Sequence, residues 1–83
     1  MEKSDVLKIV YDLCVYNRNH YYSSKHEIIF DEKEKHIKIY SVNKSATLFN
    51  TSDYVKICLA LDLNFFFDIE YVEGQLKIYM LIF

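Results

Sequence analysis

The side chains of this 83-residue chain that are best suited to metal binding are its three histidines and two cysteines. His20, His26 and His36 have no partners at the spacing of zinc ligands, so we expect no metal site and no cofactor. Cys14 and Cys58 each lie within an apolar pattern of helical spacing. This placement predicts that the two thiols are buried and pack as small apolar groups.

Catalysis is the next possibility, and the carboxylates Asp68 and Glu70 are its best candidates. They stand two residues apart, where a strand would place both on one face, and such a pair could do acid–base chemistry. Lys38 and Lys77 are expected beside them, however, which favours a solvated lattice of ion pairs. The chain also lacks a Gly-x-Ser-x-Gly motif and a cysteine beside a plausible base. We therefore predict that the protein is not an enzyme.

A third group consists of two Lys-x-Tyr pairs, Lys38–Tyr40 and Lys77–Tyr79. Tyrosines flanked by lysines can stack on the bases of a single-stranded nucleic acid, or they can supply contact area to a protein. Ten basic against twelve acidic residues leave a net charge of −2, and Asp68 and Glu70 would repel phosphates from the same face. Protein binding is therefore the favoured hypothesis, and nucleic-acid binding is the alternative.

The elements that must position these residues follow from the apolar spacing. Helices are predicted to begin at Ser4–Asp5 and at Ser52–Asp53. Strands are predicted over residues 28–30, 36–42, 65–72 and 76–83, with a turn over 31–35 and a tight turn at Glu73–Gly74. Loops are predicted over Asn17–Lys25, whose role stays open, and over residues 43–51.

The order αββαββ predicts an α+β fold: a two-layer sandwich in which a four-stranded antiparallel sheet carries two helices on one face. Residues 1–83 form one domain in this reading, with tandem half-repeats over 4–42 and 52–83. The same order of elements would result from circular permutation of a ferredoxin-like chain. The expected strand order is 3-4-2-1. Apolar residues make up 52% of the chain, enough for a core, and no apolar run reaches the roughly 18 residues of a membrane helix.

Alternation along the strands sorts their side chains into two sets. The set expected to face the helices and to be buried is Ile28, Phe30, Ile37, Ile39, Phe65, Phe67, Ile69, Tyr71, Leu76, Ile78, Met80 and Ile82. The opposite set is expected to face water and to bind the partner through Lys38, Tyr40, Phe66, Asp68, Glu70, Lys77, Tyr79, Leu81 and Phe83. Aromatic groups framed by charge are typical of a recognition surface, although the same residues could instead stabilise the sheet as cross-strand pairs.

These observations predict a small non-catalytic protein-binding module that occludes its partner stoichiometrically. A composition rich in Lys, Ile, Tyr, Asn and Phe is typical of AT-rich genomes, and it favours an inhibitor encoded by a phage or mobile element, such as an anti-CRISPR protein. A toxin-neutralising immunity protein fits equally well. The expected partner is a host or defence-system protein in the cytoplasm. A homodimer formed through Tyr40, Tyr79, Leu81 and Phe83 is a further possibility, and no membrane contact is expected.

Overall fold

The structure is a computed structural model that describes residues 2–21, 26–41 and 51–83, apart from the side chains of residues 21 and 41. Its elements are α1 (Lys3–Tyr21), β1 (His26–Asp31), β2 (His36–Ser41), α2 (Ser52–Ala60), β3 (Phe65–Val72) and β4 (Gln75–Ile82). The strands form one antiparallel sheet in the order β1-β2-β4-β3. The predicted α+β class and antiparallel sheet are confirmed, and the strand order agrees with the expected 3-4-2-1.

Helix α1 buries one stripe of apolar residues at helical spacing, while its other apolar residues Ile9, Leu13 and Tyr16 are exposed. Leu7, Val10 and Cys14 are completely buried, whereas the charged pair Lys8 and Asp12 is exposed on the opposite side. The prediction of a loop from residue 17 was wrong for residues 17–21, which continue the helix. Basic residues in this last turn favour the helix because they face its negative end.

The last turn of α1 is also tied to the sheet. The guanidinium Nη1 of Arg18 donates a hydrogen bond to the backbone carbonyl of His26, at 3.2 Å. His20 stacks on Tyr16 with ring centroids 3.9 Å apart. These contacts explain why residues 17–21 are helical although their sequence is polar.

Hairpin β1–β2 supplies the part of the sheet under α1. Its turn is closed by the carboxylate of Asp31, which accepts a hydrogen bond from the backbone N–H of Glu34 at 2.9 Å. Ile28, Ile37 and Ile39 are buried on the helix-facing side, as the alternation predicted. The predicted Val42 and the loop over 43–50 lie outside the described residues.

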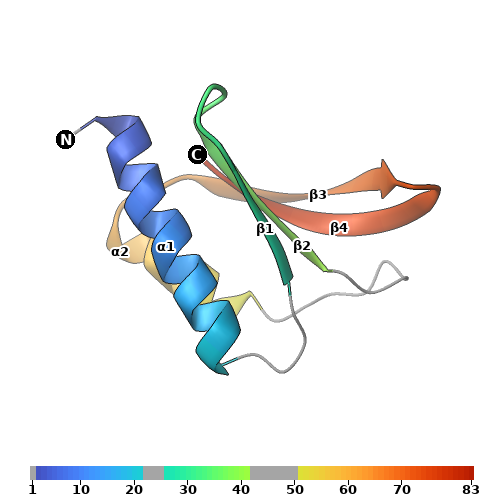
Figure 1. Cartoon of the computed structure of the whole chain (residues 1–83), viewed down its shortest axis with the longest axis horizontal. Coiled ribbons are helices and arrows are strands. Elements are labelled where there is room, and N and C mark those ends of the chain that lie inside the picture. Colours follow the sequence, from blue (N-terminus) through green and yellow to red (C-terminus); the bar gives the residue numbers. More distant parts are fainter. Residues whose placement is uncertain (1, 22–25, 42–50) are drawn as a thin grey trace.

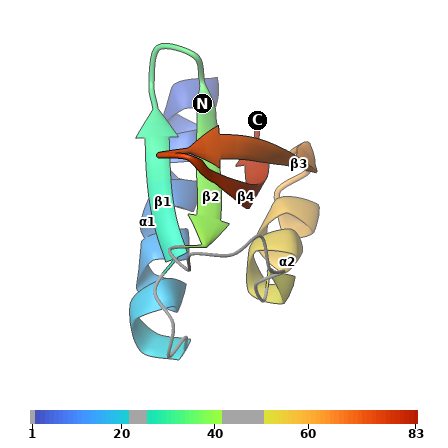
Figure 2. The same ribbon diagram turned by 90° about the vertical axis from the view of Figure 1, so that its right-hand side faces the viewer.

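Helix α2 is short and contributes two buried side chains, Tyr54 and Cys58, to the same core. It ends at Ala60 with Leu61 as its C-cap, and the backbone N–H of Leu63 donates to the carbonyl of Cys58 at 2.9 Å. The chain then turns through Asp62, which has a positive φ of 55°, into β3. The core therefore lies between the two helices on one side and β1, β2 and the near ends of β3 and β4 on the other (Figure 2).

Hairpin β3–β4 extends beyond both helices, as Figure 1 shows. An eight-residue strand is about 26 Å long, whereas a helix with its side chains is only about 10 Å wide. The predicted burial of the whole helix-facing set was consequently wrong at the far end of this hairpin. Four of its members are exposed there: Phe67, Ile69, Tyr71 and Leu76.

Candidate functional site

The residues predicted to bind a partner lie on the face of the sheet opposite the helices, which we call the outward face. Lys38 and Tyr40 on β2 are opposite Leu81 and Tyr79 on β4, and they alternate with the buried Ile37 and Ile39. Asp68 and Glu70 on β3 are opposite Tyr79 and Lys77. The predicted face is therefore confirmed for both Lys-x-Tyr pairs, because Lys38 and Tyr40 alternate with buried residues and Tyr79 lies opposite Tyr40.

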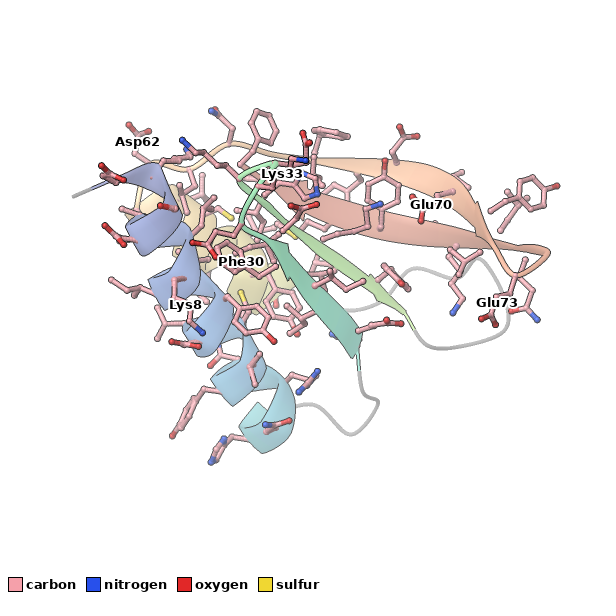
Figure 3. The ribbon with its side chains drawn as sticks, turned by 45° about the horizontal axis from the view of Figure 1, so that its top comes forward. Lys8, Phe30, Lys33, Asp62, Glu70 and Glu73 are labelled. Carbon is pink, nitrogen blue, oxygen red and sulfur yellow. The ribbon has the colours of Figure 1, made fainter. Side chains whose placement is uncertain are left out.

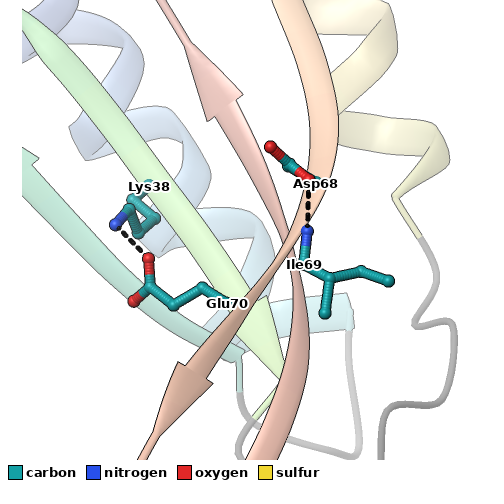
Figure 4. A network of polar contacts seen from close by, with 4 residues as sticks. All are labelled: Lys38, Asp68, Ile69 and Glu70. Atoms are coloured by element: carbon teal, nitrogen blue, oxygen red, sulfur yellow. Dashed lines mark hydrogen bonds and ion pairs between the residues drawn. The ribbon is translucent and has the colours of Figure 1, made fainter.

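Charged and aromatic groups on the outward face are paired with one another. The Nζ of Lys38 lies 2.8 Å from Oε2 of Glu70 (Figure 4) and 4.8 Å from the centre of the Tyr79 ring. Lys38 reaches Glu70 across the intervening strand β4, and the tyrosine ring lies beneath the ammonium group. Lys77 is placed over the Tyr40 ring in the same way, with 5.5 Å between Nζ and the ring centre. This arrangement is the cross-strand pairing that the sequence left open as the structural alternative.

Tyr40 departs most from the expectation for this face. Its side chain was expected to be exposed, but the residue is only 8% exposed. Burial, together with the charge of Glu27 and a hydrogen bond to that carboxylate, raises the pKa of the Tyr40 hydroxyl. Glu27 is directly opposite on β1. The ring of Tyr40 therefore belongs to the structure of the sheet.

At the β3 end of the outward face, several predicted residues are more accessible. Phe66 and Phe83 are exposed and meet edge to face, with ring centroids 5.7 Å apart. Asp68 is exposed as well, whereas Leu81 between the strands is half-buried. The predicted set thus divides into an internally paired centre and a more open margin along β3.

A larger exposed apolar surface lies on the opposite side of the same hairpin. We call it the hairpin underside, and it consists of Phe67, Ile69, Tyr71, Leu76 and Ile78. Phe67, Ile69 and Tyr71 are 45%, 55% and 72% exposed. Cross-strand pairing places Ile69 opposite Ile78 and Tyr71 opposite Leu76, so these side chains form one continuous patch. The alternation in the sequence identified the members of this patch but assigned them to the core, because it carries no information on how far the helices reach.

The acidic groups of the hairpin lie on its outward face and in its turn. Asp68 and Glu70 lie on the outward face of β3, and Glu73 stands in the turn at the far end. Figure 3 shows Glu70 and Glu73 along the hairpin, at the end of the molecule away from Lys8 on α1. Lys77 is the only basic residue of β3 and β4, and its ammonium group lies over Tyr40. The hairpin therefore carries an apolar underside and, on its opposite face, the exposed carboxylate of Asp68, whereas Glu70 is paired with Lys38.

The remaining candidate groups are buried or lie apart from this surface. His26 is 2% exposed, and its Nδ1 lies 3.0 Å from the hydroxyl of Tyr54. Burial and the neighbouring charge of Arg18 lower the pKa of His26. The predicted burial of both thiols is confirmed. Burial raises the pKa of Cys14 to about 12, with a contribution from Cys58, and that of Cys58 to about 11, so neither is an activated nucleophile.

A hollow of about 330 Å³ lies between the helices, lined by Asn17, Asp53, Lys56 and Ile57. It contains none of the residues predicted to bind a partner. Among the described residues, no three His, Cys, Asp or Glu side chains come together as a metal site would require. None of the described helices combines the length and the apolar character needed to cross a membrane.

Comparison of this chain with protein-family models, with curated proteins and with solved structures finds no match.

Proposed function

We propose that the protein is a non-catalytic protein-binding module that docks through the hairpin underside and occludes the surface of its partner. One observation carries this proposal. Phe67, Ile69 and Tyr71 project into water on a hairpin that the helices do not cover. Contiguous exposed apolar groups with a polar margin are typical of protein interfaces, where aromatic side chains supply much of the contact energy.

The arrangement of the outward face favours a protein over a nucleic acid as partner. Stacking of bases needs accessible aromatic faces and cations that are free to meet phosphates. Here Lys38 and Lys77 cover the rings of Tyr79 and Tyr40, and Lys38 is already paired with Glu70. The exposed carboxylate of Asp68 adds repulsion toward a phosphate backbone.

Stoichiometric occlusion would suit an inhibitor encoded by a phage or mobile element, such as an anti-CRISPR protein, acting in the host cytoplasm. A toxin-neutralising immunity protein would work in the same way. The finer description of the fold as a permuted ferredoxin-like chain with two half-repeats is also a proposal. The order of elements and the strand order β1-β2-β4-β3 support it.

The test compares two double variants that remove exposed apolar groups from different parts of the molecule. Phe67→Ser with Ile69→Ser alters the hairpin underside, and Ile9→Ser with Leu13→Ser alters groups of similar exposure on α1. The tagged wild-type chain and both variants are used to enrich proteins from the native host. Any enriched protein is then purified and its binding is measured by calorimetry.

We expect a partner that binds the wild-type chain and the α1 variant at a fixed molar ratio and binds the hairpin variant at least about tenfold more weakly. Equal binding by the hairpin variant and the wild-type chain would contradict the proposed docking surface. Equal losses in both variants would show non-specific apolar adsorption. Thermal unfolding of each variant confirms that the comparison is made between folded chains.

A further inference from the structure

Three residues of the hairpin underside, Phe67, Ile69 and Tyr71, also form part of the free edge of β3. Within the described part of the chain, β3 is an outer strand of the sheet and pairs only with β4. Asn64 and Phe83 exchange both of their backbone hydrogen bonds, at 3.0 and 2.9 Å. Because bonded residues alternate along an antiparallel ladder, the N–H and C=O groups of Phe65, Phe67, Ile69 and Tyr71 point away from β4.

An additional strand at this edge would satisfy those groups and extend the apolar patch. In an antiparallel pair, residues directly opposite one another project from the same side of the sheet. Every second side chain of an added strand would therefore lie beside Phe67, Ile69 and Tyr71 on the underside. The intervening side chains would lie beside Asp68 and Glu70 on the outward face.

In the middle of this edge, one backbone N–H is already bonded by a side chain of β3 itself. Oδ1 of Asp68 accepts a hydrogen bond from the backbone N–H of Ile69, at 2.8 Å (Figure 4). This donor points toward the free edge, so the contact protects the position where an added strand would bind. Charged groups on outer strands commonly limit unwanted pairing between chains. An incoming strand must displace the carboxylate, and a cation next to it would then pair with Asp68.

We propose that the free edge of β3 binds an extended segment of the partner by antiparallel strand addition, and that this segment alternates apolar residues with Lys or Arg. This inference rests on the proposed function and specifies the chemistry of the partner. The apolar residues would meet the hairpin underside. On the outward face a basic residue would meet the exposed carboxylate of Asp68, because Glu70 is already paired with Lys38.

The same charges disfavour a second copy of this chain as the occupant. Two β3 strands related by a two-fold axis would pair antiparallel. In the two registers that pair most of the strand, Asp68 lies opposite either Asp68 or Glu70 of the other copy. Like charges directly opposite one another destabilise a sheet.

The experiment titrates the ¹⁵N-labelled full chain with synthetic eight-residue peptides, up to about 1 mM, and follows the backbone amides by NMR. One peptide alternates valine with lysine, and its control alternates valine with glutamate. Two further versions of the lysine peptide carry backbone N-methyl groups, either on every valine or on every lysine. Only the valine N–H groups would face β3, because the valines lie opposite Phe67, Ile69 and Tyr71.

We expect the lysine peptide to shift the amides of residues 65–71 and to slow hydrogen exchange at Phe67 by about tenfold or more. The glutamate peptide should bind at least about fivefold more weakly than the lysine peptide. An Asp68→Asn variant should reduce this preference for lysine, because it removes the charge while retaining an oxygen that can accept the Ile69 N–H. Methylation of the valines should abolish binding, and methylation of the lysines should preserve it.

Equal binding of the two methylated peptides would overturn strand addition, and so would the absence of binding by any peptide. Neither result contradicts the proposed function, because the enrichment experiment tests it through the side chains of the underside alone. The peptide-free chain provides a further control. If its amide shifts depend on concentration and light scattering gives a doubled mass, the edge binds a second copy, and the proposed occupant is overturned.

Discussion

At the scale of single residues, the polar contact between His26 and Tyr54 joins the sheet to α2. The ring of His26 is buried on β1, and its Nδ1 lies 3.0 Å from the tyrosine hydroxyl. Arg18 lies close enough for its charge to act with burial in lowering the pKa of His26. The sequence did not predict this contact, because residues 28 positions apart meet only through the packing of three elements.

The lowered pKa of His26 predicts a specific loss of stability in acid. The unfolded chain binds a proton as the pH falls below about 6.5, whereas the folded chain does so only at a lower pH. Stability is therefore retained above this range and lost below it, by up to about 1.4 kcal/mol for one such group between pH 7.5 and 5.5. Urea unfolding at both pH values should show a smaller loss in a His26→Gln variant. An identical loss in the variant and the wild-type chain would contradict this role.

The two buried cysteines lead to a prediction about reactivity. With its pKa raised to about 12, Cys14 has a thiolate fraction of about 10⁻⁴ at pH 8. We expect neither Cys14 nor Cys58 to react with iodoacetamide in the folded protein, and both to react once urea unfolds the chain. Mass spectrometry after timed labelling measures this. Rapid modification without urea would show that the thiols are accessible and that the described core is wrong.

At the scale of elements, local sequence signals predicted turns and strands better than the ends of helices. The bounds of β3 agree with the prediction, and so does the tight turn at Glu73–Gly74. That turn is determined within its own few residues. The end of α1 depends on the contact of Arg18 with β1, which apolar spacing cannot reveal.

The tight turn also carries backbone strain that can be relieved. Glu73 has a φ of 52° and Gly74 a φ of 79°, which fits the left-handed pair of a two-residue hairpin turn. Asparagine tolerates this conformation better than glutamate. A Glu73→Asn variant should therefore be more stable by about 0.5–1 kcal/mol, measured by chemical unfolding. A loss of stability would indicate that Glu73 makes a contact that outweighs the strain.

At the scale of the whole molecule, the sheet is larger than the area that two helices can cover. Alternation along the strands predicted which residues share a side, and the register confirms this for Lys38 and Tyr79. It could not predict that Ile69 is exposed while Ile39 is buried, because both occupy helix-facing positions. The difference arises from where the helices lie, which depends on contacts between distant segments. The candidate binding surface was consequently predicted on the outward face of the hairpin, and its opposite side was missed.

The most direct test of the account is the free energy of unfolding of two matched variants, Ile39→Ala and Ile69→Ala. Both remove the same atoms from helix-facing positions, but Ile39 is completely buried and Ile69 is 55% exposed. Urea unfolding should show a loss of about 2–5 kcal/mol for Ile39→Ala and about 1 kcal/mol or less for Ile69→Ala. Equal losses would mean that the far end of hairpin β3–β4 is part of the core, and that its apolar groups are not available to a partner.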